Sequence, residues 1–372
     1  MTKFTEQMTF NSGVTLRNRI VMSPVTTVQS FTNGTVTQDE IRYYAQRAKG
    51  VGAIITGSAN VLDAGKGWPG ELSIAGDQYL PELKQLASAI QNQGAKAIVQ
   101  IYHGGRMSDP AALADHQPIA PSAVPVQHRD PKVPAPIPRE MTLAEIHETV
   151  KAFGEGTRRV IEAGFDGVEI HGANMYLFQQ FFSPHSNRRT DEYGGSLENR
   201  YRFIGEVIDE VLATVDQYAK RPFAVGYRFS PEEYSTPGIS FDDTKFLIEQ
   251  LVQTRLDYLH LSLVDHRHVS IDPQYRDKPV LEYVAETIAG RKPLIGVGGV
   301  RTRDDVNEVL QTADLVAVAR QLIMDPNWVQ KLMLGQDEDM VSADFRSAVE
   351  YANLSRPLYD FVVAWLAANS AK

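Results

Sequence analysis

Residues 142–176 read TLAEIHETVKAFGEGTRRVIEAGFDGVEIHGANMY and hold one complete helix–strand–loop unit. Thr142 and Glu145 have the capping-box spacing that begins a helix, and apolar residues then recur at helical spacing until Gly164. A short strand follows at 168–170 and breaks at His171-Gly172. A strand that follows a helix and ends in a polar loop is typical of a parallel sheet covered by helices.

The same unit recurs along most of the chain. Near-continuous apolar runs predict eight strands, at residues 20–22, 53–56, 97–101, 168–170, 223–227, 258–261, 294–297 and 315–318. Capping-box patterns at 37–40 and 302–305 begin two of the helices between them. Gly52 and Gly94 precede strands, where a left-handed residue would let the chain turn back.

Eight such units that close on themselves predict an α/β fold of the (β/α)8 TIM-barrel type. The barrel would occupy about 18–330 within a single domain of residues 1–372. A doubly wound open sheet is the alternative, but the Gly-x-Gly-x-x-Gly fingerprint that such a sheet needs is absent after the early strands.

Three segments depart from the repeat. Asn11-Ser12-Gly13 predicts the turn of an N-terminal hairpin. A long proline-rich insertion, at about 105–140, follows the third strand and is interpreted either as a lid or rim of the catalytic end, or as a surface elaboration or oligomer contact. The tail, at about 338–372, predicts a short extension of one or two closing helices that carries no recognisable chemistry.

Composition limits the functions that the chain can have. A formal net charge of −9 and a pI near 5.5 argue against nucleic acid or an anionic membrane as a partner. The absence of cysteine excludes disulfides, thiolate metal sites, cysteine-held iron–sulfur clusters and a cysteine nucleophile. Without a signal peptide or an apolar run long enough to span a bilayer, a cytoplasmic enzyme is expected. The sequence leaves a homo-oligomer open.

Three side chains suited to polar chemistry follow the fourth strand: His171, Asn174 and Tyr176. His171 and Asn174 are three residues apart, so one helical turn would let both donate hydrogen bonds to a single oxygen. A phenol at a strand-to-helix corner could supply a proton. Taken singly, each has a simpler interpretation, as a helix cap for His171 or as half-buried packing for Tyr176. Together, just past the carboxyl end of a strand, they predict a catalytic group.

The segment that contains them resembles the signature of the Old Yellow Enzyme family, the flavin-dependent NAD(P)H ene-reductases. The resemblance lies in HGANMYL at 171–177 and FSPHSNRRTDEYGGSLENRYRF at 182–203. It implies FMN as the cofactor, NADH or NADPH as the reductant, and a small electrophilic alkene as the substrate. By ping-pong hydride transfer through flavin N5, the enzyme would reduce the C=C bond of enones, nitroalkenes or quinone-like molecules. His171 and Asn174 would bind the carbonyl oxygen, and Tyr176 would protonate the α-carbon.

The resemblance also assigns residues at the flavin ring. Pro24 and Val25, after the first strand, would lie against the ring, while the Thr26 hydroxyl would donate to the flavin O4 and so tune its potential. Arg228 would stand near flavin N1, where charge collects on reduction. A local turn bond is the alternative for Thr26, and a salt bridge in the barrel mouth is the alternative for Arg228.

The ends of the second and third strands offer two more contacts for the ring. Gly57 is small enough for the ring to lie against its backbone. The Gln100 amide carries both a donor and an acceptor, as the flavin pyrimidine edge requires.

The last two strands predict a phosphate site. Gly298 and Gly299 follow the seventh strand, and Arg320 ends the eighth. Glycines let backbone N–H groups approach phosphate oxygens, and the guanidinium adds charge-assisted bonds. The family often has glycine where this chain has Ala319, which keeps the backbone donor. One phosphate site and a pocket for one ring favour FMN over FAD, and no metal is expected.

Two other classes of protein share some of these features. A phosphate-binding barrel aldolase or isomerase would need a Schiff-base lysine or a carboxylate pair at strand ends, and the sixth strand ends His260-Leu-Ser262-Leu-Val. A non-catalytic flavin-binding protein would keep the FMN residues and make little use of the three polar side chains after the fourth strand.

Overall fold

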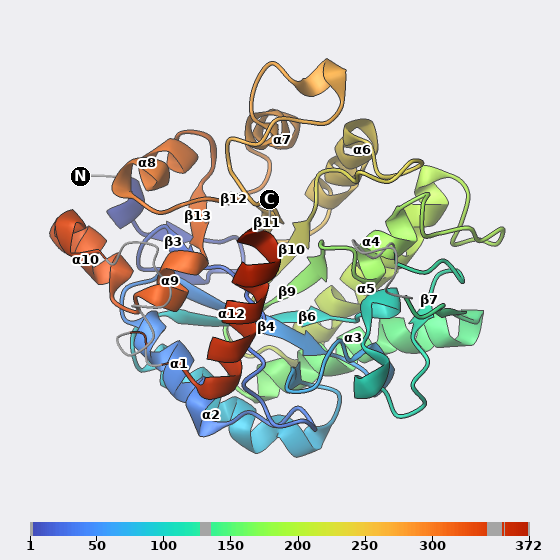
Figure 1. Cartoon of the computed structure of the whole chain (residues 1–372), viewed down its shortest axis with the longest axis horizontal. Helices are drawn as coiled ribbons and strands as arrows, with labels where there is room; N and C mark the ends of the chain where they lie inside the picture. Colours follow the sequence, from blue (N-terminus) through green and yellow to red (C-terminus); the bar gives the residue numbers. More distant parts are fainter. Residues whose placement is uncertain (1–2, 127–134, 341–351, 353, 371–372) are drawn as a thin grey trace.

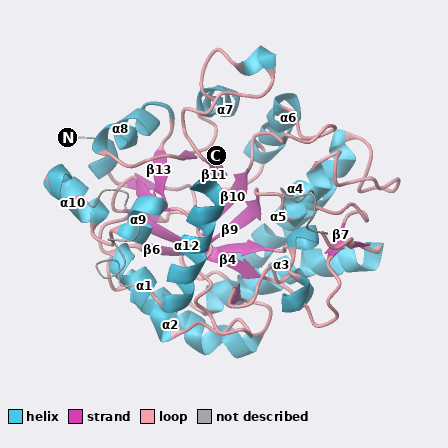
Figure 2. Ribbon diagram, viewed as in Figure 1, coloured by secondary structure: helices cyan, strands magenta, loops and turns pink. Residues whose placement is uncertain are grey.

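The computed structural model describes residues 3–126, 135–340, 352 and 354–370. Within these residues, eight parallel strands pair edge to edge, and pairing of the first with the second and the last closes the ring. Helices surround the ring (Figure 1, Figure 2). The predicted (β/α)8 barrel is therefore confirmed. Its strands are β3 (Ile20–Met22), β4 (Ala53–Asn60), β6 (Lys96–Tyr102), β9 (Gly167–Gly172), β10 (Ala224–Phe229), β11 (Tyr258–Leu261), β12 (Leu294–Val297) and β13 (Leu315–Val318).

The helices bury one face against the strands. In α2, for example, one face is fully buried and the other is polar and exposed; the buried residues are Leu83, Leu86, Ala87 and Ile90, and the exposed ones are Lys84, Gln85 and Ser88. The helices are α1 (Gln38–Ala48), α2 (Leu80–Gln91), α3 (Leu143–Glu162), α4 (Leu177–Phe182), α5 (Leu197–Tyr218), α6 (Phe241–Val252), α7 (Val280–Ile288), α8 (Arg303–Thr312), α9 (Arg320–Met324), α10 (Trp328–Leu334) and α12 (Arg356–Ser370).

The capping boxes predicted at Thr142 and Thr302 are both present. At Thr37 only half of the prediction is right. The Thr37 side chain accepts the Glu40 N–H at 3.2 Å, but the Glu40 carboxylate turns away and accepts from Thr27 and Ser30, at 2.8 and 2.5 Å. Glu40 is fully buried and so fastens the loop after β3 instead of the helix end.

The N-terminal hairpin closes one end of the barrel. Its strands, β1 (Met8–Thr9) and β2 (Thr15–Leu16), pair antiparallel around the predicted turn. Phe10, Val14 and Leu16 belong to a buried cluster with inward-facing strand residues, and the Phe10 ring stacks on Tyr258 with centroids 5.2 Å apart. Because described apolar side chains fill the amino end, a ligand site is expected toward the carboxyl ends of the strands.

Two details of the second strand differ from prediction. β4 runs to Asn60 instead of ending near Gly57, and its pairing with β6 shifts register between Ile55 and Ser58. Gly52 does not have a left-handed backbone, unlike Gly94 with φ +85°. It is required for space, because a Cβ there would lie 2.4 Å from the Asn18 carbonyl oxygen.

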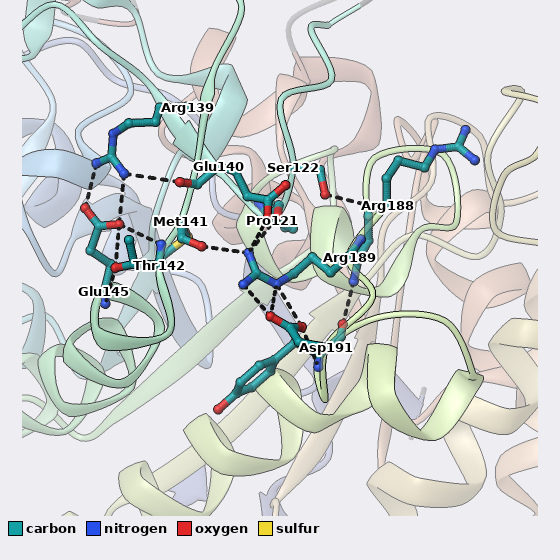
Figure 3. A network of polar contacts seen from close by, with 12 residues as sticks. Pro121, Ser122, Arg139, Glu140, Met141, Thr142, Glu145, Arg188, Arg189 and Asp191 are labelled. Atoms are coloured by element: carbon teal, nitrogen blue, oxygen red, sulfur yellow. Dashed lines mark hydrogen bonds and ion pairs between the residues drawn. The ribbon is translucent and has the colours of Figure 1, made fainter.

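The described ends of the proline-rich insertion pack beside α3 and the loop after α4. Two short parallel strands of the insertion, β7 (Ile119–Ala120) and β8 (Arg139–Glu140), pair with each other and so join its two described parts. Residues 127–134, with two of the prolines, lie outside the described part. Figure 3 shows the tie: buried Arg189 donates to the carbonyls of Pro121 and Met141, at 2.9 and 2.7 Å, and pairs with Asp191 at 2.6 Å.

Arg189→Met should therefore destabilise the protein. The substitution leaves two carbonyls without their donor and Asp191 without its cation, so the free energy of unfolding should fall by about 3–5 kcal/mol. Denaturant unfolding followed by circular dichroism measures it. Arg188→Met is the matched control, because that neighbouring side chain is exposed, and its change should stay within about 0.5 kcal/mol. Equal losses in both variants would contradict the assignment.

The tail contributes the helix α12, which crosses in front of the strands in Figure 1. Leu358 is fully buried, and the Ser355 hydroxyl donates to the Gln29 side chain at 2.6 Å. Buried Arg47 of α1 donates to the carbonyl of Ala352 at 3.1 Å. Residues 341–351 and 353 lie outside the described part. No described helix is long and apolar enough to cross a membrane.

Candidate active site

A cavity of about 540 Å³ opens at the carboxyl ends of the strands. All but one of the residues predicted for catalysis or cofactor binding line it, although they come from six different strand ends. They are Pro24, Val25, Thr26, Gln100, His171, Asn174, Tyr176, Arg228, Gly298, Gly299, Ala319 and Arg320.

Gly57 is the residue that the cavity lining does not include. Its N–H donates to the Tyr44 hydroxyl at 2.7 Å, and a Cβ there would lie 2.7 Å from the Val25 carbonyl oxygen. Gly57 therefore lets the loop after β3 pack closely on β4. The next residue, Ser58, lines the cavity in its place.

A row of polar side chains forms the floor, because strand register brings them side by side. Gln100 pairs with Glu169 across β6 and β9, and the Gln100 amide donates to that carboxylate at 2.8 Å. The other carboxylate oxygen lies 2.8 Å from His260 Nδ1. Ser58 donates to the Gln100 oxygen at 2.9 Å, which fixes the orientation of the amide. The amide keeps one N–H and one lone pair for a ligand.

Arg228 brings a buried positive charge to this floor. Its register partners are His171 on β9 and His260 on β11. Its Nε is buried and has no hydrogen-bond partner. Burial lowers the pKa of Arg228, and Glu169 raises it in part, so the guanidinium remains a cation. A buried cation beside open space is arranged to receive a group that gains negative charge.

His171 is held as a neutral donor. Its Nδ1 accepts the Ala173 N–H at 3.3 Å, so the proton sits on Nε2. Burial, with the charges of Arg228 and His260, lowers the pKa of His171 well below its ordinary value. At neutral pH the ring is uncharged, with one N–H for an oxygen in the cavity.

Asn174 reaches the cavity by a different route from the predicted helical turn. Asn174 and Met175 have left-handed backbones, with φ +58° and +63°, between β9 and α4. Ser262 donates to the Asn174 side-chain oxygen at 3.3 Å, which leaves the amide NH2 to donate. The helical-turn geometry was wrong, but His171 and Asn174 still line one cavity.

Tyr176 stands at the N-cap position of α4. Its ring lies edge-on to His171 and to Tyr102, with centroids 5.0 and 4.9 Å away. Burial raises the pKa of Tyr176, the Glu71 carboxylate adds to the rise, and Arg228 opposes it. The phenol therefore keeps its proton at neutral pH and holds it beside the two donors.

The other end of the cavity is shaped for a phosphate. Gly298 and Gly299 have left-handed backbones, and a Cβ on Gly298 would lie 2.8 Å from the Asp265 N. The ring Nδ1 of His266 lies 2.6 Å from the Gly298 carbonyl oxygen, and the backbone N–H of His266 also donates to that oxygen. Arg320 lines this end, where burial and the neighbouring Arg301 lower the pKa of Arg320. Left-handed glycines beside guanidinium groups suit a phosphate dianion.

One group of metal-type ligands lies behind this loop among the described residues: His266, Asp305 and Glu308. Arg267 pairs with both carboxylates, at 2.9 Å to Asp305. Since the guanidinium already supplies the compensating charge, the group is explained as a structural tie of the loop.

Several lining or supporting residues escaped the sequence analysis. A carboxylate within the buried run VEI and an imidazole within YLHL were signals, because buried charged groups need partners. The apolar tail gave no signal of where it docks. Glu169 and His260 support the site, and the missed residues that line the cavity include Ser58, Ser262, Arg301 and, from α12, Phe361 and Val362. No described residue of the proline-rich insertion does so, which disfavours a lid formed by its described part.

Comparisons with known proteins show the family to which the chain belongs. Residues 6–339 match the profile of the NADH:flavin oxidoreductase / NADH oxidase family. A probable NADH-dependent flavin oxidoreductase of Bacillus subtilis is 42% identical over 360 residues, with 96% of this chain and 95% of that protein covered. The NADH:acrylate oxidoreductase of Vibrio harveyi is 41% identical over 382 residues, with 100% of this chain but only 37% of that protein covered.

A solved structure has the same architecture. The old yellow enzyme homologue from Zymomonas mobilis superposes with a TM-score of 0.79 at 26% identity, and 97% of this chain and 99% of that chain are covered.

Proposed function

Since the chain belongs to the NADH:flavin oxidoreductase / NADH oxidase family, and so is an FMN-dependent enzyme that takes electrons from NADH or NADPH, we propose that it passes them to activated carbon–carbon double bonds. The observation that carries the proposal is the grouping of His171, Asn174 and Tyr176 in one cavity with a buried cation. Two neutral donors and a protonated phenol suit an acceptor whose carbonyl or nitro oxygen gains charge.

The residues present fit FMN. Arg228 has a buried Nε without a partner, and the Gln100 amide keeps a free donor and acceptor for a ring edge. Gly298, Gly299 and Arg320 would hold the phosphate, while Pro24, Val25 and Thr26 would hold the ring. When bound, FMN supplies the hydride chemistry, taking a hydride from NADH or NADPH and giving it to the acceptor.

Three side chains then act on the acceptor. His171 Nε2–H and the Asn174 amide donate to its carbonyl or nitro oxygen, which makes the β-carbon electrophilic. That oxygen gains charge only as hydride arrives, so the donors stabilise the transition state more than the ground state. The Tyr176 hydroxyl gives its proton to the α-carbon, and water later restores it. α12 narrows the cavity through Phe361 and Val362 and so limits the access of water.

The proposed acceptors are small molecules: enones, nitroalkenes and quinone-like compounds. Acrylate in the name of the Vibrio harveyi relative is also an activated alkene. Since this chain spans 37% of that protein, acrylate is offered as one member of the panel to test and no more.

Anaerobic stopped-flow spectroscopy tests the proposal in two half-reactions. NADH or NADPH should bleach the yellow holoenzyme, and cyclohexenone, a nitroalkene or acrylate should restore the colour. A holoenzyme that NADH bleaches, but that none of these alkenes reoxidises faster than buffer alone, would refute alkene reduction. A colourless protein that does not take up FMN would refute the site itself.

A further inference from the structure

A buried carboxylate lies behind the proton-donating side of the cavity. Glu71 precedes β5 (Leu72–Ser73) and is 1% exposed. Its Oε2 accepts three hydrogen bonds, from the Tyr102 hydroxyl at 2.5 Å, the Gly67 N–H at 2.7 Å and the Trp68 N–H at 3.2 Å. Its Oε1 is buried and has no partner. A carboxylate that lacks a bonded cation is costly to keep charged.

Tyr102 connects this carboxylate with the catalytic group. It is the last residue of β6, and its ring packs edge-on against Tyr176 with centroids 4.9 Å apart and planes at 82°. The same ring lies 6.2 Å from His171. A negative charge on Glu71 is thus separated from the Tyr176 phenol by one buried ring, in a region where little water screens it.

We propose that Glu71 is a positioning residue for the proton transfer. Acting through Tyr102, the Glu71 carboxylate sets how readily Tyr176 releases its proton to the acceptor. The inference rests on the function proposed above for Tyr176. While Glu71 carries its charge, a phenolate at Tyr176 faces a like charge, and proton release is opposed. When Glu71 is protonated, that opposition is gone.

The charged and titratable neighbours of Glu71 allow its carboxylate to gain or lose a proton within the pH range in which the enzyme is assayed. Lys66 faces Glu71 from the preceding loop and donates to the Thr32 carbonyl at 2.6 Å. Tyr102 and Tyr176 face it from β6 and the start of α4, and Tyr176 in turn faces Arg228 on β10 and His171 on β9. Burial raises the pKa of Glu71 to about 8, against the opposing effect of its hydrogen bonds and of Lys66.

A fluorinated tyrosine placed at position 176 tests the coupling without a turnover measurement, because fluorine makes the phenol more acidic and reports its ionisation by 19F NMR. In the FMN-loaded protein, the phenol should ionise at lower pH in Glu71→Gln than in the wild type, by about one pH unit. An unchanged ionisation pH in a folded Glu71→Gln protein would overturn the proposal.

Kinetics provide the second measurement. In pre-reduced holoenzyme, the rate of acceptor reduction should fall roughly tenfold as pH rises through the Glu71 pKa, and Glu71→Gln should abolish that fall. Tyr102→Phe keeps the ring but removes one donor to the carboxylate, so the fall should move to higher pH. A wild-type profile without the fall, or a fall that Glu71→Gln retains, would overturn the proposal. If the 19F shift is present but no alkene is reduced, the proposed function fails while the coupling stands.

Discussion

Tyr176→Phe is expected to slow acceptor reduction by about 10²- to 10⁴-fold, while reduction of the enzyme by NADH or NADPH keeps its wild-type rate. The phenol is the only group of the three that holds a transferable proton at neutral pH, because burial raises the pKa of Tyr176 and lowers that of His171. Hydride donation by a nicotinamide requires no proton, so only the second half-reaction should suffer.

Single-turnover experiments separate the two half-reactions. Each is followed by the flavin absorbance in an anaerobic stopped-flow instrument. The ring of phenylalanine preserves the edge-on packing against Tyr102 and His171, so loss of fold is not expected to obscure the result. Quinones serve as an internal control, because reduction of a quinone protonates oxygen instead of carbon and should depend less on the phenol. Equal slowing of both half-reactions, or of neither, would remove Tyr176 from the role of acid.

His171→Ala should cost acceptor reduction about 10²- to 10³-fold, the usual loss for one donor to a developing oxyanion. The effect on reduction by NADH should be much smaller, because the carboxamide oxygen of a nicotinamide gains little charge as hydride leaves. The readout is the limiting rate of each half-reaction over a series of enone concentrations, which separates binding from the chemical step.

His171→Asn is the matched control for this substitution. An asparagine amide retains an N–H donor at the position of the imidazole and should recover most of the lost rate. If the alanine and asparagine variants lose equal rate, the imidazole acts by packing and not by donation.

The barrel itself was readable from the sequence, because parallel strands covered on both faces are continuous apolar runs, as at 294–297 and 315–318. The ends of the strands were less accurate. β4 continues three residues beyond Gly57, because a shift in its pairing with β6 extends the strand without an apolar signal. This error placed Gly57 at the cavity when Ser58 lines it.

The candidate site was predicted better than the geometry behind it. His171 and Asn174 were grouped by an assumed helical turn, but the chain instead passes through two left-handed non-glycine residues, Asn174 and Met175. Asparagine tolerates that conformation, so a short-range signal was present. The buried runs VEI and YLHL indicated that Glu169 and His260 need polar partners, but not that they pair with each other. That pairing and the docking of Phe361 depend on the closed fold.

The closure of the ring has a consequence for how the chain is made. β3, the first strand of the barrel, pairs on one side with β13, which is the last of the eight strands to leave the ribosome. Until then the nascent chain carries two unpaired strand edges, a condition that favours aggregation and chaperone capture. The glycine loop after β12 and the arginine after β13 also emerge late. Cofactor loading should therefore follow synthesis of β13 and closure of the ring, so scarcity of riboflavin, the precursor of FMN, should leave a closed apoprotein that FMN can still enter.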